Sequence, residues 1–206
     1  MAKITVVGMG PGAPEYILPA AVQRLNDADT VMGGMRNVEA AAAVLKSEKK
    51  RISIRSLNEM TDRILNDHTL GSVAVAVSGD AGFYSALDAL KRAGIEPEVI
   101  PGISTFQYFY ARLGRSYWNV SLLSLHGREA RYIEVLKEGG EVFLLMDRKH
   151  TPALVARELT MQGLGARVAY VGEDLSYPEE RITRMRVDQL QTAVFSELCV
   201  MVIADA

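Results

Sequence analysis

The sequence predicts an α/β protein of two lobes, with a mostly parallel sheet in the first lobe and a mixed or antiparallel sheet in the second. Short β-branched runs alternate with longer segments of helical spacing from the first residues onward, which is typical of βαβ units and a parallel sheet. The run 73–77 is apolar at every position, as expected for a central strand covered on both faces. In the last third, two strand-like runs flank a short helical segment, which favours a mixed sheet.

The first lobe, residues 1–115, contains five strand–helix units. Its expected strands are rich in β-branched or small apolar residues and cover 4–7, 30–32, 51–54, 72–77 and 98–100. Its expected helices have apolar residues at helical spacing and cover 15–25, 37–45, 58–65, 82–93 and 104–113. Asp80 is expected to cap the helix that begins near Gly82.

The segment 114–119 interrupts the pattern, and we place the lobe boundary there. The second lobe, residues 119–206, has expected strands at 120–125, 142–146, 167–171, 181–187 and 198–203. Its expected helices cover 129–136 and 151–162.

The composition excludes several classes of protein. The 206 residues are 49% hydrophobic, which is typical of a globular core and rules out intrinsic disorder. A net charge of −2 gives no general basic field for nucleic acid or for an anionic membrane, which makes nucleic acid a minority hypothesis without excluding it. The single cysteine, Cys199, excludes a disulfide framework, and the three scattered histidines lack the paired spacing of a metal site. No run of about 18 apolar residues is present, so we expect a soluble cytoplasmic protein.

Three loops rich in small residues follow expected strands, at 8–14, 78–85 and 100–106. Ligands of open α/β sheets bind beyond the carboxyl ends of the strands, so together these loops suggest one extended small-molecule site. The first loop also matches the loose dinucleotide pattern G-x-G-x-x-A, so a Rossmann dehydrogenase is an alternative to be weighed. Against that alternative, the strand at 30–32 offers no ribose-binding carboxylate, and Pro11 and Pro14 remove amide donors.

The motifs of these loops resemble those of a known family. Gly8-Met-Gly-Pro-Gly12, Ser78-Gly-Asp-Ala81 and Pro101-Gly-Ile-Ser-Thr105 resemble the tetrapyrrole methylases, which are S-adenosylmethionine-dependent methyltransferases. Within the family, the segments 31–36, 124–128 and 172–180 look like those of the C5-methyltransferases that act on cobalt-precorrin or precorrin in cobalamin biosynthesis. The resemblance implies homodimers of two α/β lobes, with S-adenosylmethionine bound in a cleft between the lobes.

The resemblance also implies site residues. It carries cofactor contacts, several of them through backbone, onto Pro11, Ser78, Gly79, Asp80, Phe83, Ser104, Thr105, Met146 and Leu175. Without the motif, Met146 would be expected to pack in the core, because it ends an apolar strand. Two positions depart from the family pattern: Ala81 stands where proline is frequent, and Asn37 stands where the C5 group often has histidine.

A corrin precursor combines carboxylates with a broad apolar ring, so arginines beside aromatic residues suit its site. We therefore expect Arg36, Arg128 and Trp118 to contact substrate. His126 is the candidate catalytic residue, because an imidazole exchanges protons near neutral pH, although a structural histidine near a strand end is the alternative. The acidic residues 173, 174, 179 and 180 are expected to serve loop solvation and capping.

The sequence leaves other functions open. The same fold and cofactor serve uroporphyrinogen, diphthamide or ribosomal RNA in related families, and a non-catalytic nucleotide-binding regulator is a further alternative. No second glycine-rich methyltransferase motif follows the second lobe, so a C15-methylating and decarboxylating activity is expected on a separate partner polypeptide.

Overall fold

The computed structural model describes residues 3–127 and 129–205 and divides into two compact units. One unit ends at Thr105 and the other begins at Phe106. This division comes before the expected boundary at 114–119, because Phe109 and Tyr110 of the helix that starts at Thr105 are fully buried and pack with residues of the second unit.

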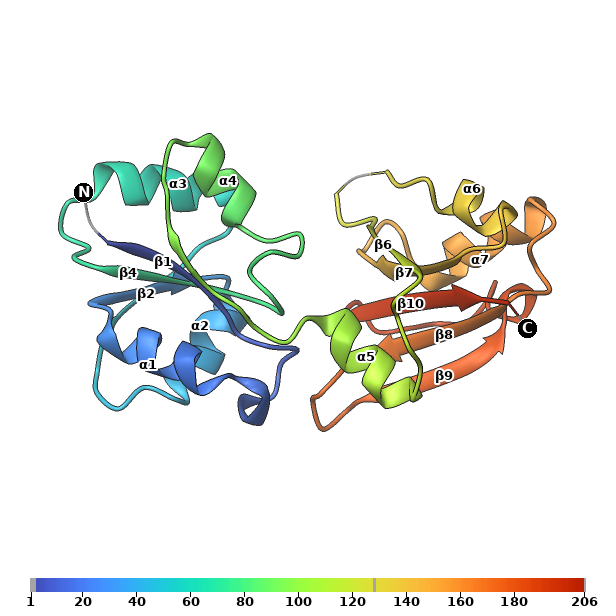
Figure 1. Cartoon of the computed structure of the whole chain (residues 1–206), viewed down its shortest axis with the longest axis horizontal. Helices are drawn as coiled ribbons and strands as arrows, with labels where there is room; N and C mark the ends of the chain where they lie inside the picture. Colours follow the sequence, from blue (N-terminus) through green and yellow to red (C-terminus); the bar gives the residue numbers. More distant parts are fainter. Residues whose placement is uncertain (1–2, 128, 206) are drawn as a thin grey trace. The chain divides into compact units, whose positions relative to one another are not determined.

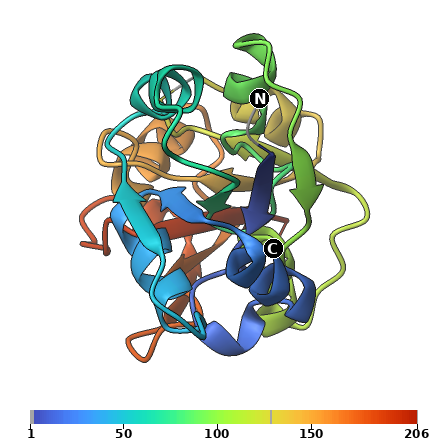
Figure 2. The same ribbon diagram turned by 90° about the vertical axis from the view of Figure 1, so that its left-hand side faces the viewer.

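The first unit contains a five-stranded, wholly parallel sheet. Its strands are β1 (Ile4–Gly8), β2 (Thr30–Gly33), β3 (Lys50–Ser53), β4 (Val73–Val77) and β5 (Glu98–Ile100), in the order β3-β2-β4-β1-β5. Its helices are α1 (Pro19–Asp27), α2 (Met35–Ala42), α3 (Leu57–Asn66) and α4 (Leu87–Arg92), with a short 3-10 turn, η1, at Pro14–Tyr16. In Figures 1 and 2, α1 and α2 cover one face of this sheet and α3 and α4 cover the other.

The alternation of β4 explains the two covered faces. Its valines, Val73, Val75 and Val77, pack in the cluster that contains Met60 of α3 and Leu90 of α4. Its alanines, at 74 and 76, pack in the cluster that contains the residues of α1 and α2. Because side chains alternate between the faces of a strand, this one segment contributes to two cores, which confirms the prediction of a central, doubly covered strand.

The second unit contains a mixed sheet, as the sequence predicts. Its strands are β6 (Val120–Ser124), β7 (Glu141–Leu145), β8 (Val168–Glu173), β9 (Arg181–Arg186) and β10 (Cys199–Ala204), in the order β6-β7-β10-β8-β9. Strands β6 and β7 pair in parallel, β10 is antiparallel to both of its neighbours, and β8 and β9 are antiparallel. Its helices are α5 (Thr105–Leu113), α6 (Tyr132–Lys137) and α7 (Pro152–Met161), and a short 3-10 turn, η2, covers Val187–Gln189.

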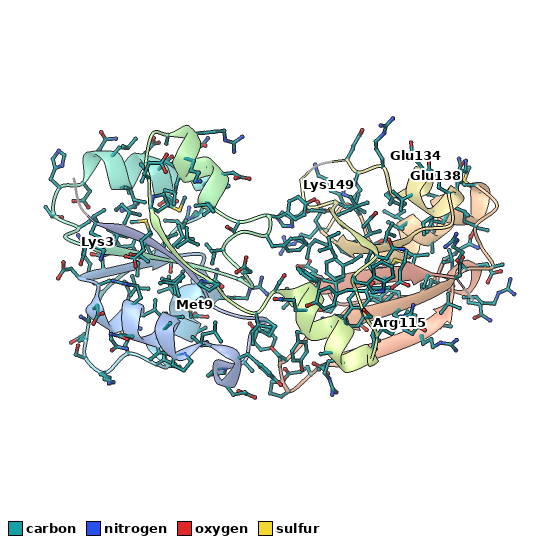
Figure 3. The ribbon with its side chains drawn as sticks, in the orientation of Figure 1. Lys3, Met9, Arg115, Glu134, Glu138 and Lys149 are labelled. Carbon is teal, nitrogen blue, oxygen red and sulfur yellow. The ribbon has the colours of Figure 1, made fainter. Side chains whose placement is uncertain are left out.

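Within this unit the helices lie on both faces of the sheet (Figure 1). Helices α6 and α7 pack through Leu136 and Leu159 on Leu144 and Met201. Helix α5 lies on the other face, where the rings of Phe106 and Phe143 are 6.1 Å apart. Arg115, labelled in Figure 3, follows α5, and its guanidinium lies 5.4 Å from the ring centre of Tyr170 in β8.

Three predicted helices begin three or more residues later than expected: α1 at Pro19 instead of Glu15, α6 at Tyr132 instead of Glu129, and α4. The sequence suggested a helix from Gly82, but α4 begins at Leu87, and Tyr84 has a positive φ of 49°. Asp80 does accept a hydrogen bond from the backbone N–H of Gly82, at 2.8 Å, so it stabilises a turn instead of a helix start. The residues between this turn and α4 therefore form an irregular loop at the end of β4.

Candidate cofactor and substrate site

The three glycine-containing loops that the sequence singled out meet at one edge of the first sheet. They follow β4, β1 and β5, which are adjacent in the strand order. A Cβ added to Gly8 would lie 2.6 Å from the backbone nitrogen of Gly102, and one added to Gly102 would lie 2.3 Å from the carbonyl oxygen of Gly79. Only glycine permits such close approach of three backbone segments.

Hydrogen bonds fix these loops to one another. The backbone N–H of Gly10 donates to the carbonyl of Gly79 at 3.1 Å, and the N–H of Gly79 donates to the carbonyl of Gly10 at 2.8 Å. Met9, labelled in Figure 3, donates its N–H to the carbonyl of Val77 and is buried. Pro11, a predicted cofactor contact, directly follows this bridge and is half-buried. These hydrogen bonds hold the loop after β1 in a fixed position against the loop after β4.

Asp80 joins the second loop to the third. One carboxylate oxygen accepts from the N–H of Gly82, and the other accepts from the N–H of Gly102 at 3.0 Å. Hydrogen bonds from N–H groups to a carboxylate are stronger than those between neutral groups. The carboxylate that the sequence assigns to cofactor contact therefore also positions the loop that leads to Ser104.

Ser104 and Thr105 lie against the Gly79 turn. A Cβ on Gly79 would lie 3.6 Å from the Cα of Ser104 and 3.8 Å from the Oγ1 of Thr105, which is ordinary contact distance. Ser104 is buried, and Thr105 is the first residue of α5. Phe83 is half-buried, and its ring meets that of Tyr84 edge-on at 4.9 Å. The structure thus brings seven of the nine predicted cofactor residues into three adjoining loops of the first unit.

Asn37 attaches the beginning of α2 to the same edge. Its side-chain N–H donates to the carbonyl of Ala76 at 3.3 Å, and its Oδ1 accepts from the Ser78 hydroxyl at 2.9 Å. The neighbouring Arg36 is exposed, and its guanidinium has no ion pair or hydrogen bond within residues 3–127 and 129–205. The sequence marks Asn37 only as a departure from the family pattern. In the structure, its side chain joins the beginning of α2 to the end of β4 and the loop that follows it.

The remaining predicted residues belong to the second unit, where three strand ends coincide. Ser124 of β6 pairs with Leu145 of β7, and Val200 of β10 pairs with both Leu145 and Gly172. Met146 and Leu175, which follow β7 and β8, therefore lie at the same edge as His126, which follows β6. Met146 packs in the main core of this unit and Leu175 is also buried, so cofactor contacts from either residue would use backbone groups.

Asp147, which the sequence did not identify, organises this edge. Its carboxylate accepts hydrogen bonds from the N–H groups of Gly127, Lys149 and His150, at 3.0, 2.9 and 2.7 Å, and contacts the Nδ1 of His150 at 2.9 Å. The backbone N–H of Gly127, followed by those of His150 and Lys149, holds the pKa of Asp147 well below its ordinary value against the opposing effect of burial. The residue thereby fixes Gly127, next to His126. A strand end followed by a tight turn is the only sequence signal for it.

His126 and Trp118 point to solvent, and Arg128 lies outside the described residues. The imidazole of His126 is exposed and has no hydrogen bond with any described residue, whereas its backbone N–H donates to the Ser124 hydroxyl at 3.2 Å. Trp118 is 86% exposed in the segment between α5 and β6. Both side chains are accessible to a ligand, but the structure does not hold either in a fixed hydrogen-bonded position.

Among residues 3–127 and 129–205, no group of three or more His, Cys, Asp or Glu side chains could hold a metal ion. No helix in the part of the chain that the structure describes is long and apolar enough to cross a membrane.

Comparison with known proteins identifies the family. A model of the tetrapyrrole (corrin/porphyrin) methylases matches residues 3–191, which is most of the chain. The chain belongs to the tetrapyrrole methylase family. Members of this family are S-adenosylmethionine-dependent methyltransferases, so the chain is an enzyme of that class, and the predicted fold class is confirmed.

Relatives within the tetrapyrrole methylases refine this placement. The chain is 34% identical, over 87% of its length and 88% of the relative's, to the cobalt-precorrin-7 C(5)-methyltransferase of Salmonella typhimurium. It is 29% identical to the decarboxylating precorrin-6Y C(5,15)-methyltransferase of Sinorhizobium, matching 87% of this chain and 44% of that protein.

Solved structures show the same fold. The uroporphyrin-III C-methyltransferase of Thermus thermophilus, crystallised with S-adenosylhomocysteine, superimposes with a TM-score of 0.78 at 19% identity, covering 98% of this chain and 92% of that chain.

Proposed function

We propose that this protein transfers the methyl group of S-adenosylmethionine to C5 of a cobalt-precorrin or precorrin in cobalamin biosynthesis. The observation that carries the proposal is the convergence of the three glycine loops at one sheet edge, in a chain 34% identical to a cobalt-precorrin-7 C(5)-methyltransferase. Membership of the family supports the cofactor, and the Salmonella relative supports the substrate.

The residues of the first unit suit this cofactor. Where glycines hold backbone segments within van der Waals contact, a ligand can lie directly against peptide groups, and both oxygens of Asp80 already receive N–H groups that keep the loops in place. In the proposed site, Pro11, Ser78, Gly79, Asp80, Phe83, Ser104 and Thr105 bind the cofactor, together with the backbone of Met146 and Leu175. When bound, S-adenosylmethionine supplies a methyl group on a sulfonium that departs as a neutral thioether.

The contribution of the protein is then mainly to orient the reacting carbon in line with that methyl group, which requires rigid loops and no strong base. The interlocked hydrogen bonds of Gly10, Gly79 and Asp80 supply this rigidity on the cofactor side. On the substrate side, Arg36 offers an exposed guanidinium with no ion-pair partner among the described residues, which suits a propionate or acetate group. Arg128 and Trp118 belong to the same proposed substrate site.

We further propose that His126 accepts the proton released when the new carbon–carbon bond forms. Its exposed imidazole follows β6 at the edge that Met146 and Leu175 share. Gly127 is held by Asp147, so the backbone next to His126 is fixed while the ring is left accessible.

The homodimer, the cytoplasmic location and the separate C15-methylating, decarboxylating partner belong to the same proposal. The Sinorhizobium relative, whose name combines C5 and C15 methylation with decarboxylation, extends well beyond the region that this chain matches. A sedimentation experiment tests the dimer: we expect twice the mass of the chain, and a monomer at micromolar concentration would contradict it.

The experiment that tests the function uses S-adenosylmethionine labelled with ¹³C in its methyl group, together with cobalt-precorrin-7. We expect one labelled methyl group in the product by mass spectrometry, and a carbon spectrum that places it at C5. Transfer to uroporphyrinogen in place of the corrin, or no transfer by folded protein that binds the cofactor, would contradict the proposed substrate.

A further inference from the structure

Glu180 lies at the end of the loop that connects β8 with β9, and its carboxylate accepts three hydrogen bonds. One oxygen accepts from the hydroxyl of Tyr108 at 2.6 Å and from the backbone N–H of Ser176 at 2.8 Å. The other oxygen accepts from the Nε of Arg112 at 2.7 Å. The side chain is 14% exposed. The sequence assigned this glutamate to loop solvation, whereas the structure makes it the centre of a cluster.

The cluster connects the loop to one helix. Tyr108 and Arg112 are four residues apart in α5, so they lie on the same face of that helix. Ser176 lies in the loop itself, between Leu175 and the glutamate. A single carboxylate therefore fastens the β8–β9 loop to α5 and also closes the loop upon itself.

The loop needs such a fastening, because part of its backbone has an unfavourable conformation. Asp174 and Ser176 have φ angles of 45° and 69°, in the left-handed region that residues with a side chain rarely occupy. Leu175 lies between them. The surrounding structure has to hold both residues in place. The backbone N–H of Ser176 is held by Glu180, and that of Asp174 donates to the carbonyl of Leu198 at 2.9 Å.

The orientation of Leu175 leaves its backbone available. A Cβ added to Gly172 would lie 2.9 Å from the Cδ2 of Leu175 and 2.7 Å from the Cε2 of Phe109, so the leucine side chain packs inward against β8 and α5. Neither the backbone N–H nor the carbonyl of Leu175 makes a hydrogen bond within the described part of the chain. Both groups are therefore available to a ligand.

We infer that Glu180 is a positioning residue for the cofactor: by fastening the β8–β9 loop to α5, it fixes the backbone of Leu175 in the conformation that receives S-adenosylmethionine. This inference rests on the proposed function, in which Leu175 is a cofactor contact.

The other end of the loop is anchored separately. Glu173, whose side chain is 3% exposed, contacts Arg181 through both oxygens, at 2.6 and 2.7 Å, and accepts from the N–H of Ser196 at 2.8 Å. These bonds hold β8 to β9 and to the segment before β10. They do not reach α5, whereas the Glu180 cluster supplies hydrogen bonds between the loop and that helix.

The ionisation state of Glu180 suits this role. Burial opposes the charged form, but the hydrogen bonds from Tyr108, Ser176 and Arg112 outweigh it, so the pKa of the Glu180 carboxyl lies below its ordinary value of 4.5. The carboxylate is therefore ionised at neutral pH.

The same unit contains a matched control. Glu141 accepts from the hydroxyl of Tyr110 at 2.6 Å and from Arg115 at 2.6 Å, with a side chain 19% exposed. The chemistry and burial are those of Glu180, and the partners are Tyr110 of the same helix and Arg115, which follows it. However, Glu141 is the first residue of β7, at the edge of the sheet opposite to Met146 and Leu175.

The experiment compares E180Q, E141Q and Y108F with the wild-type protein by calorimetric titration with S-adenosylhomocysteine, and records the melting temperature of each. Glutamine keeps the size of glutamate but lacks the negative charge, which weakens the hydrogen bonds from Arg112 and from the backbone N–H of Ser176. If the loop then adopts the binding conformation about a tenth of the time, the dissociation constant rises about tenfold. We expect that rise for E180Q, a smaller rise for Y108F, and a change of less than about twofold for E141Q.

In steady-state assays, E180Q is expected to raise the KM for S-adenosylmethionine while kcat at saturating cofactor changes little. Unchanged affinity in E180Q, or equal weakening in E141Q and E180Q, would overturn the inference, because a general loss of stability affects both variants alike. Wild-type protein that binds no S-adenosylhomocysteine would overturn the proposed function first and this inference with it.

Discussion

Replacing Gly102 with alanine should separate the loops on which the proposed cofactor site depends. Gly102 is not among the glycines with positive φ, so the effect of the substitution is steric. The new Cβ would lie 2.3 Å from the carbonyl oxygen of Gly79 and 2.8 Å from the carbonyl carbon of Gly8. Both are backbone atoms of buried glycines, which cannot rotate away, so the loops must move apart.

The size of the effect follows from two contributions. Forcing extra volume into a packed region costs about 1 to 3 kcal/mol. The same movement stretches the hydrogen bond from the Gly102 N–H to Asp80, and a hydrogen bond to a charged group contributes about 1.5 to 3 kcal/mol. Since part of that bond survives, we expect a loss of about 2 to 4 kcal/mol in the free energy of unfolding.

Urea denaturation measures this loss. With a slope of about 2 kcal/mol per molar urea, the midpoint of G102A should fall by about 1 to 2 M. Gly34 provides the control, because a Cβ there meets nothing closer than the Asn37 Nδ2 at 4.0 Å and its φ of −59° suits alanine. G34A should shift the midpoint by less than about 0.3 M, with a cost of at most about 0.5 kcal/mol. Equal midpoints for G102A and G34A would refute the close contact of the three loops.

Three further predictions concern the second unit. Burial, followed by the nearby Glu173 and Asp174, raises the pKa of the Cys199 thiol to about 12, so iodoacetamide at pH 8 should label it only after unfolding; rapid labelling of native protein would contradict this environment. The pKa of Asp147 lies below its ordinary value of 3.8, so its stabilising effect is complete above about pH 4 and is lost as the pH falls through the folded-state value. The variant D147N should therefore melt at a lower temperature than the wild-type protein at pH 7. The difference between the two melting temperatures should narrow as the pH falls toward about 3. H126A should reduce kcat by about a hundredfold or more with little change in S-adenosylhomocysteine affinity, and unchanged turnover would remove the proposed role of His126 in proton transfer.

Most of the fold could be predicted from the sequence, because it depends on local periodicity. The run 73–77 indicated a doubly covered strand, and the structure divides its valines and alanines between two cores. The predicted start of α4, at Gly82, was wrong by five residues. Apolar spacing from Gly82 suggested a helix, but the turn at Asp80 and the positive φ of Tyr84 prevent regular helix before Leu87.

The site was predictable where it depends on strand order and unpredictable where it depends on distant side chains. Parallel strands place their following loops at one edge, so the meeting of the Gly8, Gly79 and Gly102 loops follows from the pattern. Glu180 and Tyr108 are 72 residues apart, and no local signal distinguishes Glu180 from the neighbouring Glu179. The implied cleft and the roles of the individual site residues stay predictions.

The central claim is that the glycine loops of the first unit form a site for S-adenosylmethionine, and calorimetric titration with S-adenosylhomocysteine tests it most directly. We predict micromolar binding, about −8 kcal/mol, by the wild-type protein, and loss of that binding when Ser104 and Thr105 are both replaced by leucine. No detectable binding by wild-type protein that circular dichroism shows to be folded, or undiminished binding by the double variant, would contradict the claim.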